Sequence, residues 1–341
     1  MHFAPALRRR GALLGAGVAV VMLCAGCGEL AARSSDGPPR PLTVAIDGRP
    51  NALYAALYEA QALGDFTRGA LAVTITTPPG GDSLGALERG SAGVAVASEP
   101  QLLTARDRGA QLVAIGALVA RPLDAFVSLA RRPVSGASAL AGHTVASAGT
   151  PLAGAQLDTA LAGAGIAAPS VRRVQAGSNL AGALEHGHAI ATLGGPWPLE
   201  VAALEKAHHS PTVLELPNAG VPTYSGLVLV VRVGEAHYKG PLLRAFLQSL
   251  TRGATAVATD PSAAATTLAH IDPLLSGAFE RSALAALAPL APRTSASQPF
   301  GYQNPYAWRA LGVWMHQHGL LHNANAGGLA ITNEFLPGQG E

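Results

Sequence analysis

The segment from Ser91 to Ala130 places the strongest constraint on the fold of this chain. It contains three short apolar runs rich in valine, alanine and isoleucine, at positions 93–97, 111–115 and 125–129. A helix-like segment from Glu99 to Arg108, ended by Gly109, separates the first two runs. This alternation is typical of βαβ units in a parallel sheet. Because ligands of open α/β sheets lie beyond the carboxyl ends of the strands, the residues that follow the first run are expected at a cleft.

The same alternation continues on both sides of this segment and predicts an α/β protein with two lobes. Pro133 and Gly136 interrupt the pattern and indicate a crossing to a second lobe. The long run of leucine and valine from Leu227 to Val233 is interpreted as the return into the first lobe. We therefore assign residues 42–130 and 224–341 to the first lobe and residues 131–223 to the second.

Two helix starts carry clear local signals. Asn304 is a candidate N-cap, Pro305 takes the first turn, and Gly319 ends the helix. Three apolar side chains of this helix share one face and are expected to dock on the core: Trp308, Leu311 and Met315. Asn51 is a candidate N-cap of an earlier helix. In that helix Leu53, Leu57 and Ala60 have helical spacing and are expected to face the sheet.

The first 27 residues resemble a bacterial lipoprotein leader. Three arginines precede an apolar run from Gly11 to Leu23, which is shorter than the ~20 residues of a membrane-spanning helix. Ala25 and Gly26 before Cys27 resemble a lipobox, although the usual leucine three places upstream is Cys24. We expect a lipidated Cys27, a flexible linker over residues 28–41, and a protein anchored to the cell membrane outside the cytoplasm. Ordinary secretion with cleavage nearby is the alternative.

Composition excludes several functional classes. Lysine and arginine number 23 against 21 acidic residues, so no nucleic-acid partner is expected. Both cysteines lie in the leader, which excludes disulfides, thiolate metal sites and a cysteine nucleophile in the rest of the chain. His316 and His318 are two residues apart and do not share a helical face, so no metal site is expected. No Gly-x-Ser-x-Gly elbow is present, and we predict neither catalysis nor a cofactor.

Several polar and aromatic residues follow predicted strands of the second lobe or join the lobes. Thr150 lies in a loop before a helix, where free backbone N–H groups can face a ligand. Trp197 follows a strand and two glycines, and Glu200 lies about one helical turn later. Tyr224 lies on the return crossing. These positions suit a cleft wall, while a place in the core remains the alternative for both aromatic residues.

Long segments of the chain are similar to a known family. They are LLTARDRGAQLVAIGALVARPL (102–123), GGPWPLE (194–200), GVPTY (220–224), GYQNPYAWRALGVWMHQHGLL (301–321) and TNEFLPG (332–338). These segments resemble the bacterial substrate-binding proteins for thiamine pyrimidine precursors, which belong with the nitrate, sulfonate and taurine binding proteins of ABC importers. The resemblance implies the two-lobed type II periplasmic binding protein fold, in which each lobe is a mixed sheet flanked by helices.

The resemblance also carries residues onto the expected cleft. Asp47, Asn51, Glu99, Trp197, Glu200 and Tyr224 match the family pattern, and with Thr150 they form the predicted ligand-binding set. Three positions depart from it. Gly48 and Ser98 stand where the family has aromatic residues, and Gly226 stands where the family has an acidic residue. Losing these groups weakens the expectation of a pyrimidine ligand.

The resemblance implies a monomeric receptor that captures a small organic ligand between two lobes and delivers it to ABC permease subunits without chemistry. The alternative is an enzyme of the same fold that makes the thiamine pyrimidine from pyridoxal phosphate. That enzyme would need a lysine in the cleft and a cysteine-rich motif. The only two lysines are Lys206, beside Glu205 on a predicted helix, and Lys239, after a loop. We therefore favour the receptor.

Overall fold

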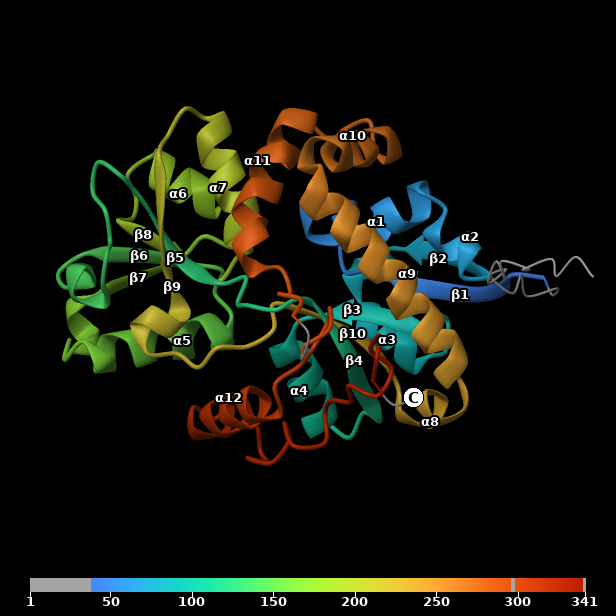
Figure 1. The fold of residues 1–341 in the computed structure, drawn as a ribbon. Coiled ribbons are helices and arrows are strands. Elements are labelled where there is room, and N and C mark those ends of the chain that lie inside the picture. Colours follow the sequence, from blue (N-terminus) through green and yellow to red (C-terminus); the bar gives the residue numbers. More distant parts are fainter. Residues whose placement is uncertain (1–37, 296–297, 340–341) are drawn as a thin grey trace, which may run out of the picture. The chain divides into compact units, whose positions relative to one another are not determined.

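Two five-stranded sheets organise the chain in a computed structural model that describes residues 38–295 and 298–339 (Figure 1). The expected leader with Cys27, and the linker as far as residue 37, lie outside the described residues. The first strand already begins at Arg40 and so includes the last two residues expected for the linker over 28–41. The described residues belong to one compact unit by their contacts, and that unit is not divided further into lobes.

The first sheet has the strand order β2-β1-β3-β10-β4. Its strands are β1 (Arg40–Ala45), β2 (Leu71–Thr76), β3 (Val94–Ala97), β4 (Leu112–Val119) and β10 (Leu227–Arg232). Strand β1 pairs in parallel with β2 and β3, while β10 runs antiparallel between β3 and β4. The buried strands β3 and β4 read as continuous apolar runs, as expected when both faces of a sheet are covered.

The second sheet repeats this arrangement in the order β7-β6-β8-β5-β9. Its strands are β5 (Ala125–Leu129), β6 (Thr144–Ser147), β7 (Arg172–Gln175), β8 (Ala191–Leu193) and β9 (Pro211–Glu215). Strand β6 is parallel to β7 and β8, and β5 is antiparallel to β8 and β9. Each sheet therefore has one antiparallel strand in the fourth place, and both sheets are mixed, as the sequence predicted.

One part of the sequence interpretation is wrong. The apolar run 125–129 is a strand, but it pairs in the second sheet, and β10 separates β3 from β4 in the first. The chain crosses between the sheets at residues 120–124, which we call the first crossing, and not after Ala130. Pro122 lies in this crossing and has no backbone N–H for a strand ladder. The second crossing, residues 216–226, contains Tyr224 as expected.

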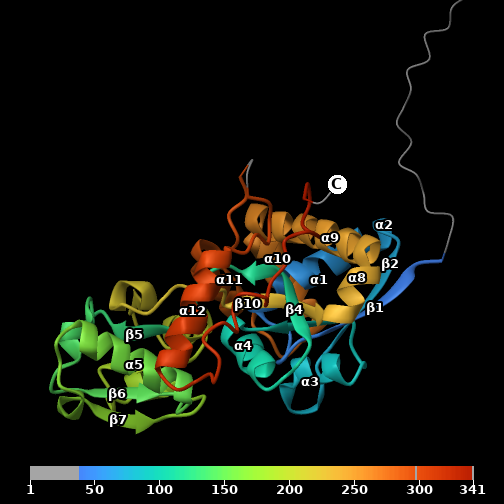
Figure 2. The ribbon, with the colours of Figure 1, turned by 90° about the horizontal axis from the view of Figure 1, so that it is seen from below.

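Helices flank both sheets (Figures 1 and 2). Those on the second-sheet part of the chain are α5 (Pro151–Gly163), α6 (Leu180–Glu185) and α7 (Trp197–Lys206). The others are α1 (Ala55–Ala62), α2 (Asp65–Arg68), α3 (Ser83–Glu88), α4 (Glu99–Asp107), α8 (Val233–Tyr238), α9 (Gly240–Thr259), α10 (Pro261–Ile271), α11 (Gly277–Leu287) and α12 (Pro305–Gln317). Short 3₁₀ helices cover Ala52–Tyr54, Pro79–Gly81, Ala137–Leu140, Ala168–Ser170, Leu216–Ala219 and Ala288–Leu290.

Two helix contacts join the parts built around the two sheets. Helix α11 packs on α7, beside which it lies in Figure 1, and Ser282 Oγ donates a hydrogen bond to a carboxylate oxygen of Glu205. On another side, α12 reaches α5, where Trp314 Nε1 donates to Thr159 Oγ1 at 3.0 Å. No helix of the described residues is both long and apolar enough to cross a membrane.

The structure confirms the two helix starts predicted from the sequence. The Asn304 side chain accepts a hydrogen bond from Tyr306 N at 2.9 Å, and Gly319 has a φ of +69°, which favours glycine after a helix end. The apolar face of α12 (Trp308, Leu311 and Met315) is buried. Asn51 caps the 3₁₀ turn that leads into α1, whose Leu57 and Ala60 are fully buried.

Segments from the C-terminal part of the chain cover the outer edge of β4. Three alanine amides of this edge strand, or of the residue that follows it, donate to carbonyls far along the chain. The bonds are Ala114 N to Ala330 O at 2.8 Å, Ala117 N to Gly301 O at 2.8 Å and Ala120 N to Leu290 O at 2.9 Å. Thr332 N also donates to Ala114 O at 2.9 Å. These four edge groups are thus satisfied within the chain and not by a neighbouring strand.

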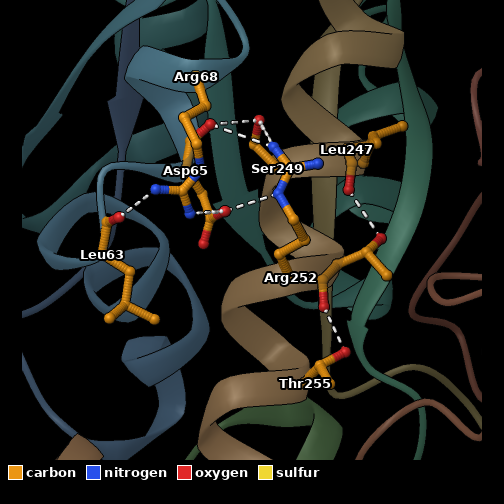
Figure 3. Close-up of polar contacts among 8 residues, drawn as sticks. Leu63, Asp65, Arg68, Leu247, Ser249, Arg252 and Thr255 are labelled. Carbon is orange, nitrogen blue, oxygen red and sulfur yellow. Dashed lines mark hydrogen bonds and ion pairs between the residues drawn. The ribbon is translucent and has the colours of Figure 1, made fainter. Parts of the chain in front are cut away.

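A buried carboxylate attaches α2 to α9 (Figure 3). Asp65 Oδ1 accepts hydrogen bonds from Arg68 Nη2 and from Arg252 Nε, both at 2.6 Å. Ser249 Oγ donates to the backbone oxygen of Asp65 at 3.0 Å. The Asp65 side chain is only 2% exposed, whereas both arginines remain partly in solvent. This cluster holds the end of a very short helix against the longest helix among the described residues.

We expect Asp65→Asn to lower the free energy of unfolding by about 1–3 kcal/mol, because the charged acceptor of two guanidinium groups is lost from a buried position. Urea denaturation measures the loss. Asp158→Asn is the matched control, since its ion pair with Arg173 leaves the side chains 52% and 38% exposed. Such exposed pairs contribute about 0–1 kcal/mol. An equal loss in the two variants would contradict the structural role of Asp65.

Candidate functional site

The described residues form a cleft of about 930 Å³ at the two crossings. Its floor includes Leu123 and Asp124 of the first crossing and Tyr224 and Gly226 of the second. The starts of α3, α4 and α5 and the turn before α7 also line it. Carboxyl ends of parallel strands in both sheets lead to this place, as expected for ligand sites of open α/β folds. Four residues of the predicted set line this cleft: Asp47, Asn51, Thr150 and Tyr224.

Asp47 and Asn51 follow β1 at the first-sheet side of the cleft. Tyr54 Oη donates a short hydrogen bond to Asp47 Oδ1. Burial, followed by the nearby Asp47 charge, raises the pKa of Tyr54, so this phenol stays a donor. Asn51 uses both ends of its amide locally, because Oδ1 accepts from Leu53 N at 2.9 Å and Nδ2 donates to Arg49 O at 3.0 Å. Asn51 therefore shapes the cleft wall through its turn.

Thr150 has a comparable capping role on the second-sheet side. Its Oγ1 accepts a hydrogen bond from Ala153 N at 3.2 Å and begins α5. The preceding Gly149 has a φ of +79°, and a Cβ at that position would lie 3.1 Å from the Gln175 side chain. Glycine thus allows the tight loop that brings Thr150 to the cleft.

Tyr224 belongs to a polar cluster that the sequence analysis missed in part. Its Oη donates to Asp124 Oδ2 at 2.7 Å, and Gln156 Nε2 of α5 donates to Asp124 Oδ2 at 3.1 Å and lies 3.0 Å from Tyr224 Oη. Burial raises the pKa of Asp124, while the two hydrogen bonds from Gln156 and Tyr224 oppose that shift. Among the described residues no donor reaches Asp124 Oδ1. This carboxylate therefore offers a free acceptor to the cleft floor.

The sequence around Asp124 contains a local indication that this residue lies near a strand end. It is an acidic residue directly before an apolar strand and two residues after a proline. Because that strand was assigned to the first lobe, the residue before it was not placed at a crossing. Gln156 stands out only as a polar residue on a largely apolar helix.

The other three predicted residues lie outside the cleft lining. Glu99 is completely buried, and its Oε2 accepts a hydrogen bond from Ser225 N at 2.7 Å. Its backbone N donates to Ser225 O at 3.2 Å, so Glu99 fixes the second crossing to the start of α4. Burial raises the pKa of Glu99 to about 8, and the hydrogen bonds from Ser225 oppose the shift.

Trp197 and Glu200 are also buried behind the cleft wall. Trp197 N donates to Leu123 O at 2.9 Å and ties the start of α7 to the first crossing, while its indole packs in the core. Glu200 accepts a hydrogen bond from Thr192 Oγ1 of β8, and burial raises its pKa to about 7. A place in the core, which was the alternative left open for Trp197, therefore explains the contacts of both residues.

The three departures from the family pattern all line the cleft. Gly226 N donates to Arg121 O at 3.1 Å, and a Cβ at Gly226 would lie 2.6 Å from that oxygen. The close contact of the two crossings therefore excludes a side chain at position 226. A Cβ at Gly48 would meet only Tyr54 Oη, at 3.9 Å, so the space of the lost aromatic residue is open. Ser98 caps α4 in a capping box with Gln101.

The charged groups of the cleft are mainly acidic. Three carboxylates line it, from Asp47, Asp82 and Asp124, against one guanidinium, that of Arg108. The backbone N–H of Gly85 and the Arg89 side chain lower the pKa of Asp82, which keeps it charged. Across the described residues no group of three or more histidine, cysteine or acidic side chains could hold a metal ion. The cleft suits a ligand that donates hydrogen bonds.

Comparisons with known proteins agree with this architecture. Residues 51–264 match the family model described as NMT1/THI5 like. The formylaminopyrimidine-binding protein of Halalkalibacterium halodurans is 26% identical over 294 residues, which cover 84% of this chain and 88% of that protein.

Solved structures share the fold. The alkanesulfonate-binding protein SsuA from Xanthomonas axonopodis pv. citri, bound to MOPS, has a TM-score of 0.62 and 20% identity over 87% of this chain and 99% of its own. The periplasmic aliphatic sulphonate binding protein SsuA from Escherichia coli has a TM-score of 0.65 and 16% identity over 84% of this chain and 95% of its own.

The two mixed sheets, joined by two crossings at a cleft, define the periplasmic binding protein-like fold, as these neighbours do. Since the matched family model spans more than half of the chain, the protein belongs to the NMT1/THI5-like family. The resemblance identified in the sequence is thereby confirmed.

The raised pKa of Glu99 predicts a pH dependence of stability. Between pH 4.5, which is the ordinary pKa of a glutamate, and about pH 8, Glu99 is protonated in the folded protein and ionised in the unfolded chain. The free energy of unfolding therefore falls as the pH rises from 5 to 8, by about 1.4 kcal/mol for each pH unit. We expect Glu99→Gln to reduce this slope in thermal unfolding, without abolishing it because Glu200 acts in the same direction. The exposed control Glu88→Gln keeps the slope, and an unchanged slope in Glu99→Gln would refute the prediction.

Proposed function

We propose that this protein is the solute-binding component of an ABC importer and that it captures a small nitrogen heterocycle with amino groups. The family and the fold support the receptor role. The relative named for binding formylaminopyrimidine supports the ligand class. In this proposal the protein works outside the cytoplasm, attached to the membrane through Cys27, and hands its ligand to permease subunits. No step changes the ligand chemically.

The Asp124 cluster is the observation that carries this proposal. Asp124 comes from one crossing and Tyr224 from the other, so the cluster lies where the two parts of the chain meet. With Oδ2 already held by Tyr224 and Gln156, the free Oδ1 is an oriented acceptor for an amino N–H. An aminopyrimidine presents such N–H groups on a flat ring. Charged hydrogen bonds of this kind contribute about 1.5–3 kcal/mol.

Asp124 also explains how a carboxylate can serve the cleft although position 226 is a glycine. The tight contact between Gly226 N and Arg121 O leaves no room for an acidic side chain there. Asp124 lies on the adjacent crossing, three residues after Arg121, and supplies a carboxylate to the same floor. Asp47 and the phenol of Tyr54 offer further polar contacts at the first-sheet side, and Thr150 at the second.

The acidic lining disfavours sulfonates and other simple anions. Acidic side chains outnumber basic ones in the lining, with Asp47, Asp82 and Asp124 against Arg108. An ionised carboxylate repels an anion more strongly where water is excluded. The likeness to sulfonate-binding structures, at 16–20% identity, concerns the fold. We therefore propose a neutral or cationic head group for the ligand.

A binding role fits the lining better than synthesis from pyridoxal phosphate. Neither lysine of the chain lines the cleft, so no amine is placed to form a Schiff base there. Lys206 lies at the end of α7, and Lys239 forms an ion pair with Glu235 at 3.0 Å. We propose instead that the ligand shifts a balance between open and closed forms by rotation about the two crossings.

Calorimetry and thermal-shift measurements with 4-amino-5-hydroxymethyl-2-methylpyrimidine and formylaminopyrimidine test the proposal. We expect both to stabilise the protein and Asp124→Asn to weaken binding by about tenfold to a hundredfold, since 1.4 kcal/mol corresponds to tenfold. Tyr224→Phe should weaken binding less, because it removes only the group that orients Asp124.

Asp158→Asn, on the same helix as Gln156 but away from the cleft lining, is the control and should bind as the unchanged protein does. Stabilisation by alkanesulfonates alone, or equal binding by Asp124→Asn and Asp158→Asn, would contradict the proposed ligand class.

A further inference from the structure

One face of α4 forms a long wall of the cleft. Ser98, Gln101, Thr104 and Arg108 all line the cleft. Their spacing of three, three and four residues places them on the same helical face. At a rise of ~1.5 Å per residue, the ten steps from Ser98 to Arg108 span about 15 Å. The cleft thus extends well beyond the floor at the crossings, along the whole of α4.

The polar groups in the middle of this wall are largely occupied within the helix. Ser98 Oγ accepts from Gln101 N at 3.2 Å, and Gln101 Oε1 accepts from Ser98 N at 2.7 Å. Thr104 Oγ1 donates to Pro100 O at 2.8 Å. A ligand passing along α4 therefore meets few free acceptors or donors before it reaches Arg108.

Arg108 differs from the other residues of this wall and from the nearby Arg106. The guanidinium of Arg106 donates to Leu112 O and is part of the fold. The Arg108 side chain is exposed, and no hydrogen bond or ion pair joins its guanidinium to any described residue. It is also the only basic residue in the cleft lining. The far end of the wall therefore carries one unpaired positive charge, although the cleft as a whole is acidic.

The end of α12 encloses the same far end of the cleft. Asp107, next to Arg108, accepts hydrogen bonds from His322 N at 2.9 Å and Asn323 N at 3.0 Å. This contact fixes the segment after α12 beside the end of α4. Gly319 and Leu320, just before that segment, line the cleft, as does Met315. The far end is thus bounded by apolar groups and one guanidinium.

The size of the cleft agrees with a ligand longer than one ring. Its volume of about 930 Å³ is near the upper end of the ~300–1,000 Å³ found for sites of drug-sized ligands. Gly48 leaves open the space that an aromatic side chain would fill, because a Cβ there would meet only Tyr54 Oη, at 3.9 Å. The start of α4 is fixed to the second crossing through Glu99, so Arg108, about 15 Å further along the helix, lies beyond a single ring bound at Asp124.

We infer that the cleft takes an elongated ligand whose N–H-donor head lies at Asp124 and whose anionic tail lies at Arg108. The inference rests on the proposed function and adds a second recognition point to it. A phosphate or carboxylate tail would pair with the planar guanidinium in a charge-assisted hydrogen bond. The apolar groups between the two points suit an uncharged or aromatic middle.

Thiamine and thiamine monophosphate are suitable probes, because they share an aminopyrimidine head and differ in a terminal phosphate. By calorimetry we expect the monophosphate to bind at least tenfold more tightly than thiamine. Arg108→Gln should remove this gain without weakening thiamine binding, because thiamine carries a permanent positive charge and has no anionic group that could pair with Arg108. Arg309→Gln is the matched control, since Arg309 lies on α12 outside the cleft lining and its side chain forms no hydrogen bond or ion pair with a described residue. It should keep the full gain.

The result separates this inference from the proposed function. Equal binding of the two probes, or an equal loss for both in Arg108→Gln, would overturn the elongated ligand while shorter aminopyrimidines still bind. The elongated ligand is also overturned if neither probe binds to the protein while shorter aminopyrimidines do. Absence of binding for every aminopyrimidine would overturn the proposed ligand class and this inference with it. Unchanged melting temperatures of the ligand-free variants verify that the exposed substitutions leave the fold intact.

Discussion

The close contact between the two crossings is the constraint on which the cleft depends. Gly226 N donates to Arg121 O, and the two backbones approach so closely that no side chain fits at position 226. Each crossing is then fixed to one neighbouring helix. Glu99 holds Ser225 of the second crossing, and Trp197 N holds Leu123 of the first. With both backbones fixed, Asp124 and Tyr224 meet in one hydrogen bond at the floor. The buried residues around the cleft thus position the few side chains that face it.

Most individual elements could be predicted because their signals are local. The apolar run 125–129 is β5, and the helix expected from Glu99 to Arg108 ends one residue earlier in α4. Capping residues such as Asn304 act through hydrogen bonds within a few positions, so a sequence displays them directly. Pairing between strands is different. Strand β10 lies between β3 and β4 although more than a hundred residues separate it from them, and no local period carries that information.

The candidate site also contains residues that could be predicted from the sequence and residues that could not. Asp47, Asn51 and Thr150 follow strands β1 and β6 and line the cleft. The loop before a helix indicated Thr150, whereas Asp47 and Asn51 were predicted from the family resemblance. For Glu99, Trp197 and Glu200 these indications were too coarse, because a residue at the start of a helix can face the cleft or the core. Asp124 was missed since its partners Gln156 and Tyr224 lie 32 and 100 residues away. A carboxylate whose two partners come from two other, distant elements is visible only in the folded chain.

The cover on the outer edge of β4 has a consequence for how this protein behaves in a concentrated solution. An open sheet edge exposes a row of unpaired amides and carbonyls that another molecule can extend. Here the amides of Ala114, Ala117 and Ala120 donate to the carbonyls of Ala330, Gly301 and Leu290, so the segments around these three carbonyls protect the edge against pairing with another molecule. Removal of residues 290–332 would expose these amides at the edge of β4 to pairing with another molecule.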